Sequence, residues 1–258
     1  MNYGLYLSAA GVITNLHRQD VLANNLANVN TVGFKPDTVY TRQRLPQRQE
    51  ASLPIEPHWL LEQLGGGQAA NPTYLSFRQG NLLETGNDLD LAIDGDGFLV
   101  VSATSGTGNE SIRLTRDGRL TLNANGELIL AATGMRVLDV NDQPIRLDGA
   151  AKVEIKSTGE VIQDGQVRAT IQITSPADPS RLTKVGDNLL RLSSSGPIER
   201  APAGGRLLQG HLEASAVDPI MTLNAMISAT KAAQANIKMM QYHDHIMGQA
   251  VNTLGRVA

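Results

Sequence analysis

The first part of the chain carries apolar and small side chains at helical spacing. From about Tyr3 to Asn28 there is no proline, and the apolar positions are separated by steps of four and three, with Gln19 filling one gap. These positions are Leu5, Ala9, Val12, Leu16, Ala23 and Leu26. Heptad spacing over about three repeats predicts a helix with one packing seam. Because Arg18 and Asp20 are the only charged residues in this stretch, we expect the helix to have partners on more than one side.

The end of the chain repeats this periodicity. Asp218-Pro219 is a helix start signal, because Asp accepts hydrogen bonds from the first free amides and proline suits the first helical position. Proline is then absent to Ala258, and steps of three and four connect Met226, Ala229, Ala233, Asn236, Met240, His243, Met247, Ala250 and Leu254. Such a helix is about 50 Å long, more than is usual in compact domains. We predict that it pairs with the N-terminal helix as a coiled coil, with a compact bundle as the alternative.

Between the helical stretches the apolar period changes to two. Residues 112–114, 120–122 and 128–130 alternate apolar with polar positions, and Asp117-Gly118 and Asn125-Gly126 separate them. These dipeptides favour two-residue hairpin turns. The pattern continues through 135–140, a turn at 141–142, and strands predicted at Val153–Ile155, Val167–Ile173 and Leu189–Leu192. Short strands with frequent turn signals predict an antiparallel all-β domain from about Gly80 to Gly210.

The segment from Pro36 to Gln79 matches neither period. It holds five prolines and the run Gly65-Gly66-Gly67, which is typical of an extended arm with flexible joints. The predicted fold class is therefore α+β, with paired terminal helices joined by the arm to a central β domain. The predicted divisions are 1–35 for the N-terminal helix and the residues after it, 36–79 for the arm, 80–210 for the β domain and 211–258 for the C-terminal helix.

Composition removes several classes of function. The 258 residues have a formal net charge of −3 and nine aromatic side chains, which argues against a nucleic-acid surface. The absence of cysteine excludes disulfides, thiolate metal sites and a cysteine nucleophile. No segment reaches the length of about 20 apolar residues that a membrane span requires, and the N-terminus is a poor secretory signal. Charged residues make up 18%, below the typical quarter, which suggests that other protein covers part of the surface.

Motifs for chemistry are weak. An EF-hand needs glycine at its sixth position and glutamate at its twelfth, and no loop starting at Asp88 or Asp94 supplies them. We interpret Asp88, Asp90, Asp94 and Asp96 as turn residues around a buried strand. Gly95-x-Gly97 lacks the third glycine and the helix of a dinucleotide site. No cofactor is expected.

Two further groups have structural interpretations. His243 and His245 are two residues apart, so on a helix they project about 200° apart and cannot chelate one ion. We expect one in the packing seam and the other facing outward. Arg42, Arg44 and Arg48 form the densest basic cluster, which is either solvated or in contact with an acidic neighbour such as another subunit.

The most informative stretch is Ala23–Lys35, in which four of seven residues from 24 to 30 are asparagine. Asparagine favours helix ends and turns because its amide competes for nearby backbone groups. It is useful where a helix ends against other backbones whose polar groups need partners. Gly33 suits a left-handed position beyond the helix end. The pattern predicts a helix terminus at a packed junction, formed by Asn24, Asn25, Leu26, Asn28, Gly33, Phe34 and Lys35.

This stretch resembles the N-terminal signature of flagellar axial proteins, specifically the basal-body rod proteins. Residues 83–93 with Gly95-Asp96-Gly97-Phe98 are similar to the entry into that family's β domain, and Leu114–Gly118 to its aromatic-Thr-Arg-Asp-Gly turn. Residues 210–217 resemble the segment before its C-terminal helix. Ala216 replaces a usual asparagine, and Lys231–Gln234 stands where an Arg-x-Tyr-Glu run is typical. These departures slightly favour a proximal-rod over a distal-rod type.

The resemblance implies a non-enzymatic subunit of the rod, which crosses the periplasm and transmits torque. It also implies export by the flagellar type III apparatus without a cleaved signal, and helical polymerisation with the paired helices around the central channel. Expected partners are copies of itself, other rod and hook-side axial proteins, the export apparatus and surrounding ring proteins. The helix positions expected to serve assembly are Leu5, Val12, Leu16, Met226, Ala233, Met240, Met247 and Leu254, besides the junction residues.

Two other hypotheses remain. One is a soluble binding module whose β domain holds a ligand while the helices dimerise. The other is a hydrolase built on the aspartates between 88 and 96, although nothing assigns acid and base roles among them.

Overall fold

The computed structural model describes residues 3–46, 65–104, 110–149, 151–176, 178–192 and 200–254. The chain forms two compact units. The helix unit comprises Met1–Ala27, Asp37–Tyr74 and Asp218–Ala258, and the β unit comprises Asn28–Pro36 and Leu75–Val217. Residues 28–35, which the predicted divisions place with the N-terminal helix, therefore belong to the β unit.

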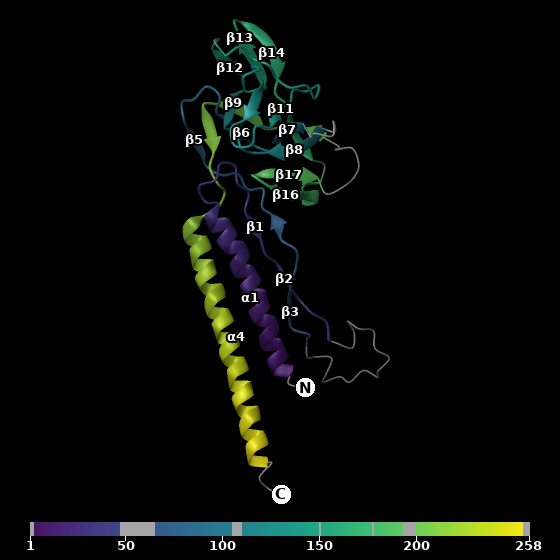
Figure 1. Ribbon diagram of the computed structural model, residues 1–258, viewed down its shortest axis with the longest axis vertical. Helices are drawn as coiled ribbons and strands as arrows, with labels where there is room; N and C mark the ends of the chain where they lie inside the picture. The colour runs from purple at the N-terminus through teal and green to yellow at the C-terminus, as the bar shows by residue number, and fades with distance from the viewer. Residues whose placement is uncertain are drawn as a thin grey trace, which may run out of the picture. The chain divides into compact units, whose positions relative to one another are not determined.

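The helix unit contains two long helices, α1 (Tyr3–Ala27) and α4 (Pro219–Leu254), which pack side by side (Figure 1). The predicted start of α4 is confirmed, since Asp218 Oδ1 accepts hydrogen bonds from the amides of Ile220 (2.9 Å) and Met221 (3.0 Å). Pairing of the terminal helices is confirmed as well, whereas their coiled-coil geometry stays a prediction.

Two glycines of α1 define the register of this pair. Gly4 lies against the ring of His243, and Gly11 lies against the amide of Asn236. Seven residues forward on α1 thus correspond to seven residues back on α4, so the helices run antiparallel. A Cβ atom on Gly11 would lie 2.7 Å from Asn236 Nδ2, which shows how closely the helices approach there.

The predicted seam of α4 is right from Met226 to His243 and exposed beyond it, and the predicted seam of α1 is misplaced. On α4, Ala229 and Ala233 are buried. The seam positions that are half-buried are Met226, Asn236, Met240 and His243. On α1, Leu16 is 47% exposed, and Leu5 and Val12 are half-buried. Leu5 and Val12 each follow a contact glycine by one residue, which turns them about 100° round the helix from it. The apolar pattern did not reveal the contact face because glycine, with no side chain, marks it.

A second face of α1 meets strands of the predicted arm. Strand β1 (Asp37–Thr38) pairs with β4 (Tyr74–Leu75), and β2 (Thr41–Gln43) pairs antiparallel with β3 (Gln68–Ala70). Thr14 Oγ1 donates to Gln68 O (3.4 Å) as well as to its own helix, and Arg44 donates to Tyr6 Oη (2.7 Å). The expectation that α1 has partners on more than one side is confirmed. Arg48 lies outside the described residues.

The β unit is built around an antiparallel sheet. Its strands run in the order β16-β17-β8-β7-β11-β10-β9, and β15 pairs with both β7 and β18. Their bounds are β7 Phe98–Thr104, β8 Glu110–Thr115, β9 Leu120–Leu122, β10 Leu128–Leu130, β11 Arg136–Val137, β15 Ile173–Pro176, β16 Leu182–Gly186, β17 Leu189–Leu192 and β18 Arg200–Pro202. A one-turn 3₁₀ helix, Pro179–Arg181, precedes β16. The predicted antiparallel β domain is therefore confirmed.

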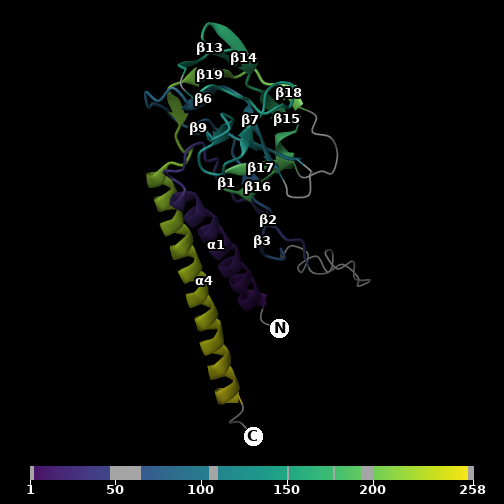
Figure 2. The ribbon, with the colours of Figure 1, turned by 45° about the horizontal axis from the view of Figure 1, so that its top comes forward.

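Smaller ladders complete this unit (Figure 2). One sheet has the order β12-β13-β14, and β6 pairs with β19 and β5 with β20. Their bounds are β5 Leu82–Glu84, β6 Leu91–Asp94, β12 Val153–Ile155, β13 Glu160–Gln163, β14 Gln166–Thr170, β19 Arg206–Gln209 and β20 His211–Glu213. The single strand predicted over 167–173 is wrong, because β14 ends at Thr170 and β15 begins at Ile173.

Strand β7 lies at the centre of the packing. Leu99 and Val101 belong to one apolar cluster, and Phe98 and Val100 belong to another. Successive side chains of a strand point to opposite faces, so β7 is buried on both. This strand reads as a continuous apolar run in the sequence for that reason.

One of the two predicted hairpins is wrong. Strands β9 and β10 do pair around Asn125-Gly126, where Gly126 has a φ of 74°. Their connection is longer than the predicted two-residue turn, because the last pair in the ladder is Leu122 with Leu128. Strands β8 and β9 are not neighbours, so Asp117-Gly118 is a corner between separate ladders. Asp117 is buried there and accepts from the amide of Arg119 (3.1 Å) and from its guanidinium.

Candidate assembly site

The asparagine-rich end of α1 is joined to the first arm strand through one amide. Buried Asn25 donates from Nδ2 to Asp37 O (2.8 Å) and accepts at Oδ1 from Asp37 N (3.0 Å). A side-chain amide can satisfy both backbone groups of one residue, whereas a carboxylate can only accept. The prediction that these asparagines serve other backbones is confirmed at this position. Asn24 is exposed, and Leu26 is half-buried.

The turn after α1 requires its glycine. Thr31 bonds to Asn28 through its amide (3.2 Å) and its hydroxyl (3.1 Å), and Gly33 then adopts a φ of 68°. A Cβ atom on Gly33 would lie 2.4 Å from Arg116 O, and the Gly33 amide donates to Glu213 O (2.7 Å). Because of its positive φ and the close backbone approach, any larger residue in place of Gly33 would cost free energy of folding.

Phe34 anchors the same turn in the β unit. Its ring is buried and lies 4.1 Å from Lys184 Nζ, measured to the ring centroid. Its carbonyl accepts from the amide of Ala216 (3.1 Å), and Asn188 Nδ2 donates to Val32 O (2.6 Å). The residues that follow α1 and those that precede α4 are thus hydrogen-bonded to each other.

A buried ion cluster lies at the centre of this junction. Glu213 Oε1 is 2.6 Å from Lys35 Nζ, and its Oε2 is 3.1 Å from Arg116 Nη1. The side chains of Lys35, Glu213 and Arg116 are 3%, 1% and 5% exposed, respectively. The amide of Gly80 adds a hydrogen bond to Oε1 (2.9 Å). One carboxylate therefore links four separate segments of the chain.

Backbone carbonyls accept further hydrogen bonds from the two cations, whereas Arg116 Nε is buried without a partner among the described residues. Lys35 Nζ donates to Arg78 O (2.8 Å), and Arg116 donates to Ile93 O (3.3 Å) and Gly95 O (2.8 Å). The guanidinium also lies 5.2 Å from the Phe98 ring centroid, within the range of cation–π attraction.

Burial dominates the electrostatics of Lys35. Desolvation lowers the pKa of its ammonium below the ordinary 10.5, although the hydrogen bond and the charge of Glu213 act in the opposite direction. The positive charge of Arg116 lowers this pKa further. Breaking a buried ion pair by removing one partner typically costs about 3–5 kcal/mol, so this cluster strongly favours one arrangement of its four segments.

Each member of this cluster lies in a stretch that resembles the rod-protein family, but no local pattern links the three. Lys35 closed the signature, Arg116 lay in the Thr-Arg-Asp-Gly turn, and Glu213 lay in the segment before α4. Lys35 and Glu213 are 178 positions apart. The available signal was that charged residues interrupt otherwise apolar or small surroundings at 33–35 and 212–214.

The helix pair exposes much apolar surface in a single copy. Large exposed side chains of α1 include Tyr6, Ile13 and Leu16, and those of α4 include Ile220, Met221, Leu223, Ile227, Ile237, Met239, Tyr242, Ile246, Met247 and Val251. Charged residues in α4 are limited to Lys231, Lys238 and Asp244. So many large apolar side chains exposed on one helix pair are typical of an interaction surface.

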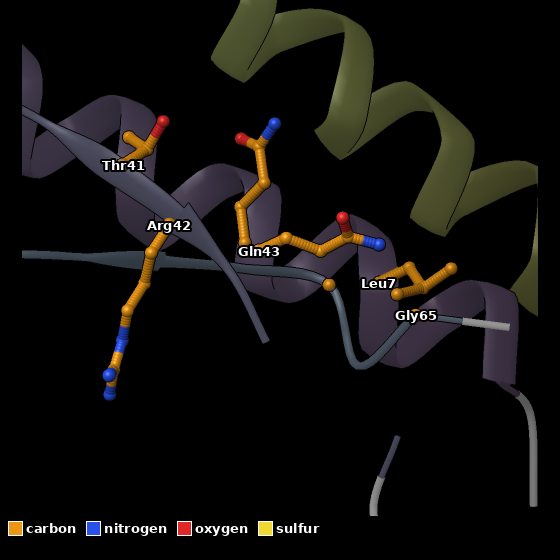
Figure 3. A pocket seen from close by; sticks show the side chains of 7 residues that line it. Leu7, Thr41, Arg42, Gln43 and Gly65 are labelled. Atoms are coloured by element: carbon orange, nitrogen blue, oxygen red, sulfur yellow. The ribbon is translucent and has the colours of Figure 1, made fainter. Parts of the chain in front are cut away.

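A shallow open pocket of about 420 Å³ lies in the helix unit between α1 and the strands β2 and β3 (Figure 3). It is lined by Leu7, Thr41, Arg42, Gln43, Gly65, Gly67 and Gln68. Arg42 extends away from α1. The lining holds no carboxylate or imidazole, so it offers no acid–base pair.

The remaining candidate residues have structural surroundings. Buried Asp90 accepts hydrogen bonds from Thr85 Oγ1 (2.7 Å) and Asn87 Nδ2 (3.1 Å), as a turn residue does. His243 faces Gly4 and His245 is exposed, which confirms the expectation for this pair. In the described part of the chain, no three His, Asp or Glu side chains gather as metal ligands. None of the described helices is long and apolar enough to cross a membrane.

Three family models match the chain. The flagella basal body rod protein model matches residues 5–35, the flagellar hook protein FlgE/F/G D1 domain model matches 92–169, and the flagellar basal body rod FlgEFG protein C-terminal model matches 208–253. Each matched range contains one member of the buried cluster, namely Lys35, Arg116 and Glu213 in turn.

Similar proteins extend over the whole chain. The flagellar basal-body rod protein FlgF of Caulobacter vibrioides is 33% identical over 261 residues, covering 100% of both chains. The flagellar basal-body rod protein FlgG of Borreliella burgdorferi is 32% identical over 272 residues and 98% of both chains. FlgF of Mesorhizobium japonicum is 30% identical over 99% of both. The near-equal identities to FlgF and FlgG do not separate the two types.

Proposed function

This chain belongs to the family of flagellar basal-body rod proteins, and on that premise we propose that it polymerises helically through its terminal helices. Like its relatives, it is a structural protein and not an enzyme. The resulting rod crosses the periplasm as a drive shaft and encloses the export channel.

The observation that carries this proposal is the unequal burial within the helix unit. The side chains of α1 that a single copy buries are Ser8, Thr14 and Asn25, whereas Ile13 is 67% exposed. A helix pair that buries polar and small residues and exposes large apolar ones gains free energy when other helices cover it, at about 25 cal/mol per Å². Contacts between different surfaces of identical copies produce filaments when the rotation between copies does not close into a ring.

The junction around Glu213 supports a role in transmitting force. It ties the residues directly after α1 to those directly before α4 through buried ion pairs and backbone hydrogen bonds. A subunit that transmits torque needs such fixed connections where its polymerising segments begin.

The residues proposed to serve assembly are those of the two helices and the junction. They are Leu5, Val12, Leu16, Asn24, Asn25, Leu26, Asn28, Gly33, Phe34, Lys35, Met226, Ala233, Met240, Met247 and Leu254. Of these, the side chain of Leu254 lies outside the described residues. Arg42 and Arg44 fit a contact with an acidic neighbouring subunit.

The test is incorporation into basal bodies. In a strain that lacks the endogenous subunit, Tyr242→Asp should abolish incorporation and motility, because Tyr242 is 65% exposed on α4 and a carboxylate there opposes apolar packing. The control Tyr242→Phe keeps the ring and should incorporate normally. Normal basal bodies with the Asp variant would contradict assembly through this helix.

We propose the proximal rod over the distal rod, on the strength of the departures at Ala216 and Lys231–Gln234 alone. The proposed neighbours are other rod and hook-side axial proteins and the surrounding rings. Export through the flagellar type III apparatus without cleavage predicts that the protein in purified basal bodies retains its N-terminal residues. Mass spectrometry of that material tests the point, and a cleaved N-terminal segment would contradict it.

A further inference from the structure

Among the described residues, the register of the helix pair leaves the last turns of α4 without a partner helix. Gly4, at the described start of α1, lies against His243, so residues 244–254 of α4 extend past it. These residues correspond to about 16 Å of helix. All side chains described from 244 to 252 are exposed.

The apolar face that packs on α1 continues into this extension. Met247 follows Ala233 and Met240 at seven-residue steps, and Val251 lies one turn beyond. Met247 is 43% exposed and Val251 is 73% exposed. We call these two residues the extension seam. It is the same stripe of α4 that is covered up to His243 and uncovered after it.

A second uncovered stripe lies at the other end of α4. Ile220, Leu223 and Ile227 are spaced by three and four residues, so they share one face of the first turns, and all three are exposed. We call them the root stripe. Between 219 and 230, and again between 245 and 254, α4 has no Lys, Arg, Asp or Glu. Charge repulsion therefore does not oppose contact between the two surfaces.

We propose that the extension seam of one copy packs on the root stripe of a second copy. The inference deepens the proposed function, on which it rests, by naming the surfaces that meet. A second copy fits because the contact continues an interface that α4 already makes with α1 through the same stripe. Contact between two extension seams would close a dimer and leave both root stripes exposed, whereas the head-to-tail contact uses both surfaces of every copy and propagates.

The absence of cysteine makes the contact directly testable by disulfide trapping. Val251→Cys and Leu223→Cys are introduced together into the full chain, and basal bodies from cells that express it are oxidised. A ladder of covalent dimers, trimers and longer species is expected for the double variant, because each copy links to two others. Either single variant should give no ladder.

A matched pair controls for mere proximity. Ser228 is exposed on a different face of α4, near Leu223 along the helix, so Val251→Cys with Ser228→Cys should give a much weaker ladder. An equal ladder in this control, or efficient dimers from Val251→Cys alone, would overturn the head-to-tail contact.

A charge variant separates this inference from the proposed function. Val251→Asp should raise the subunit concentration needed for polymerisation by about tenfold or more, whereas Asn252→Asp, which adds the same charge at the exposed neighbour, should not. If the unaltered chain enters basal bodies while Val251→Asp polymerises normally, the contact is wrong and the proposed function stands. If the unaltered chain does not enter basal bodies, the proposed function itself fails.

Discussion

The two units of this chain bury opposite kinds of side chain. In the β unit, the large apolar residues of β7 are enclosed on both faces, and even the charged residues of the junction are paired and buried. In the helix unit, small or polar residues such as Thr14 and Ala233 are buried, while Ile13 and Val251 lie open. The difference teaches that the β unit completes its packing within one copy and that the helix unit is built to complete it with others.

Removing the central carboxylate should have the largest effect on stability. Glu213→Gln leaves Lys35 and Arg116 buried without a counter-charge, so the free energy of unfolding should fall by about 3–5 kcal/mol. Urea denaturation of the full chain, followed by circular dichroism, measures it. The control Glu154→Gln alters an exposed carboxylate on β12 and should change stability by no more than about 0.5 kcal/mol. Equal effects of the two would contradict a stabilising role for the cluster.

Truncating one leucine in each unit tests the comparison directly. Leu99→Ala in β7 should cost about 2–5 kcal/mol through lost burial and the cavity left behind. Leu16→Ala on α1 should cost about 0.5 kcal/mol or less in the isolated chain, because Leu16 is already half in solvent. The same denaturation experiment measures both. A similar loss in both units would show that the helix unit is as fully packed as the β unit.

Substituting two glycines that have nearly equal φ angles distinguishes the cost of backbone strain from the cost of close packing. Gly33 has a φ of 68° and lies against Arg116 O, whereas Gly86 has a φ of 70° and open space around it. Gly86→Ala should cost about 1–2 kcal/mol from the left-handed backbone alone. Gly33→Ala should cost about 1–3 kcal/mol more, because its Cβ also overlaps the carbonyl. Equal losses in the free energy of unfolding would mean that the backbone around Gly33 moves to accommodate the added Cβ at no cost.

The smallest expected effect is a pH dependence from Lys35. The pKa of Lys35 in the folded protein lies below the unfolded value of 10.5, so between the two values the unfolded chain binds more protons. Stability must then rise with pH through that interval. Lys35→Arg keeps its charge throughout and lacks this contribution. The stability of the unaltered chain relative to Lys35→Arg should therefore increase toward pH 10.5, and a constant difference would contradict the shift.

Local sequence patterns predicted helix starts and turns correctly where neighbouring residues alone determine them. Asp218 caps α4 and Asn125-Gly126 turns between β9 and β10, because each depends on groups a few residues away. The error at Asp117-Gly118 has the opposite origin. The dipeptide permits a tight turn, but pairing of β8 with β7 and β17 decides which strands become neighbours.

The sequence by itself determined the two helices, the antiparallel β domain, the seam of α4 and the family. These follow from periodicity, caps, turns and short motifs, all of which act over a few residues. The tertiary structure alone decided that Gly4 and Gly11 mark the face of α1 that meets α4, and that Lys35, Arg116 and Glu213 share one buried site. The physical reason is that a glycine contact and a buried ion pair depend on which distant backbones come together, and no local pattern carries that information.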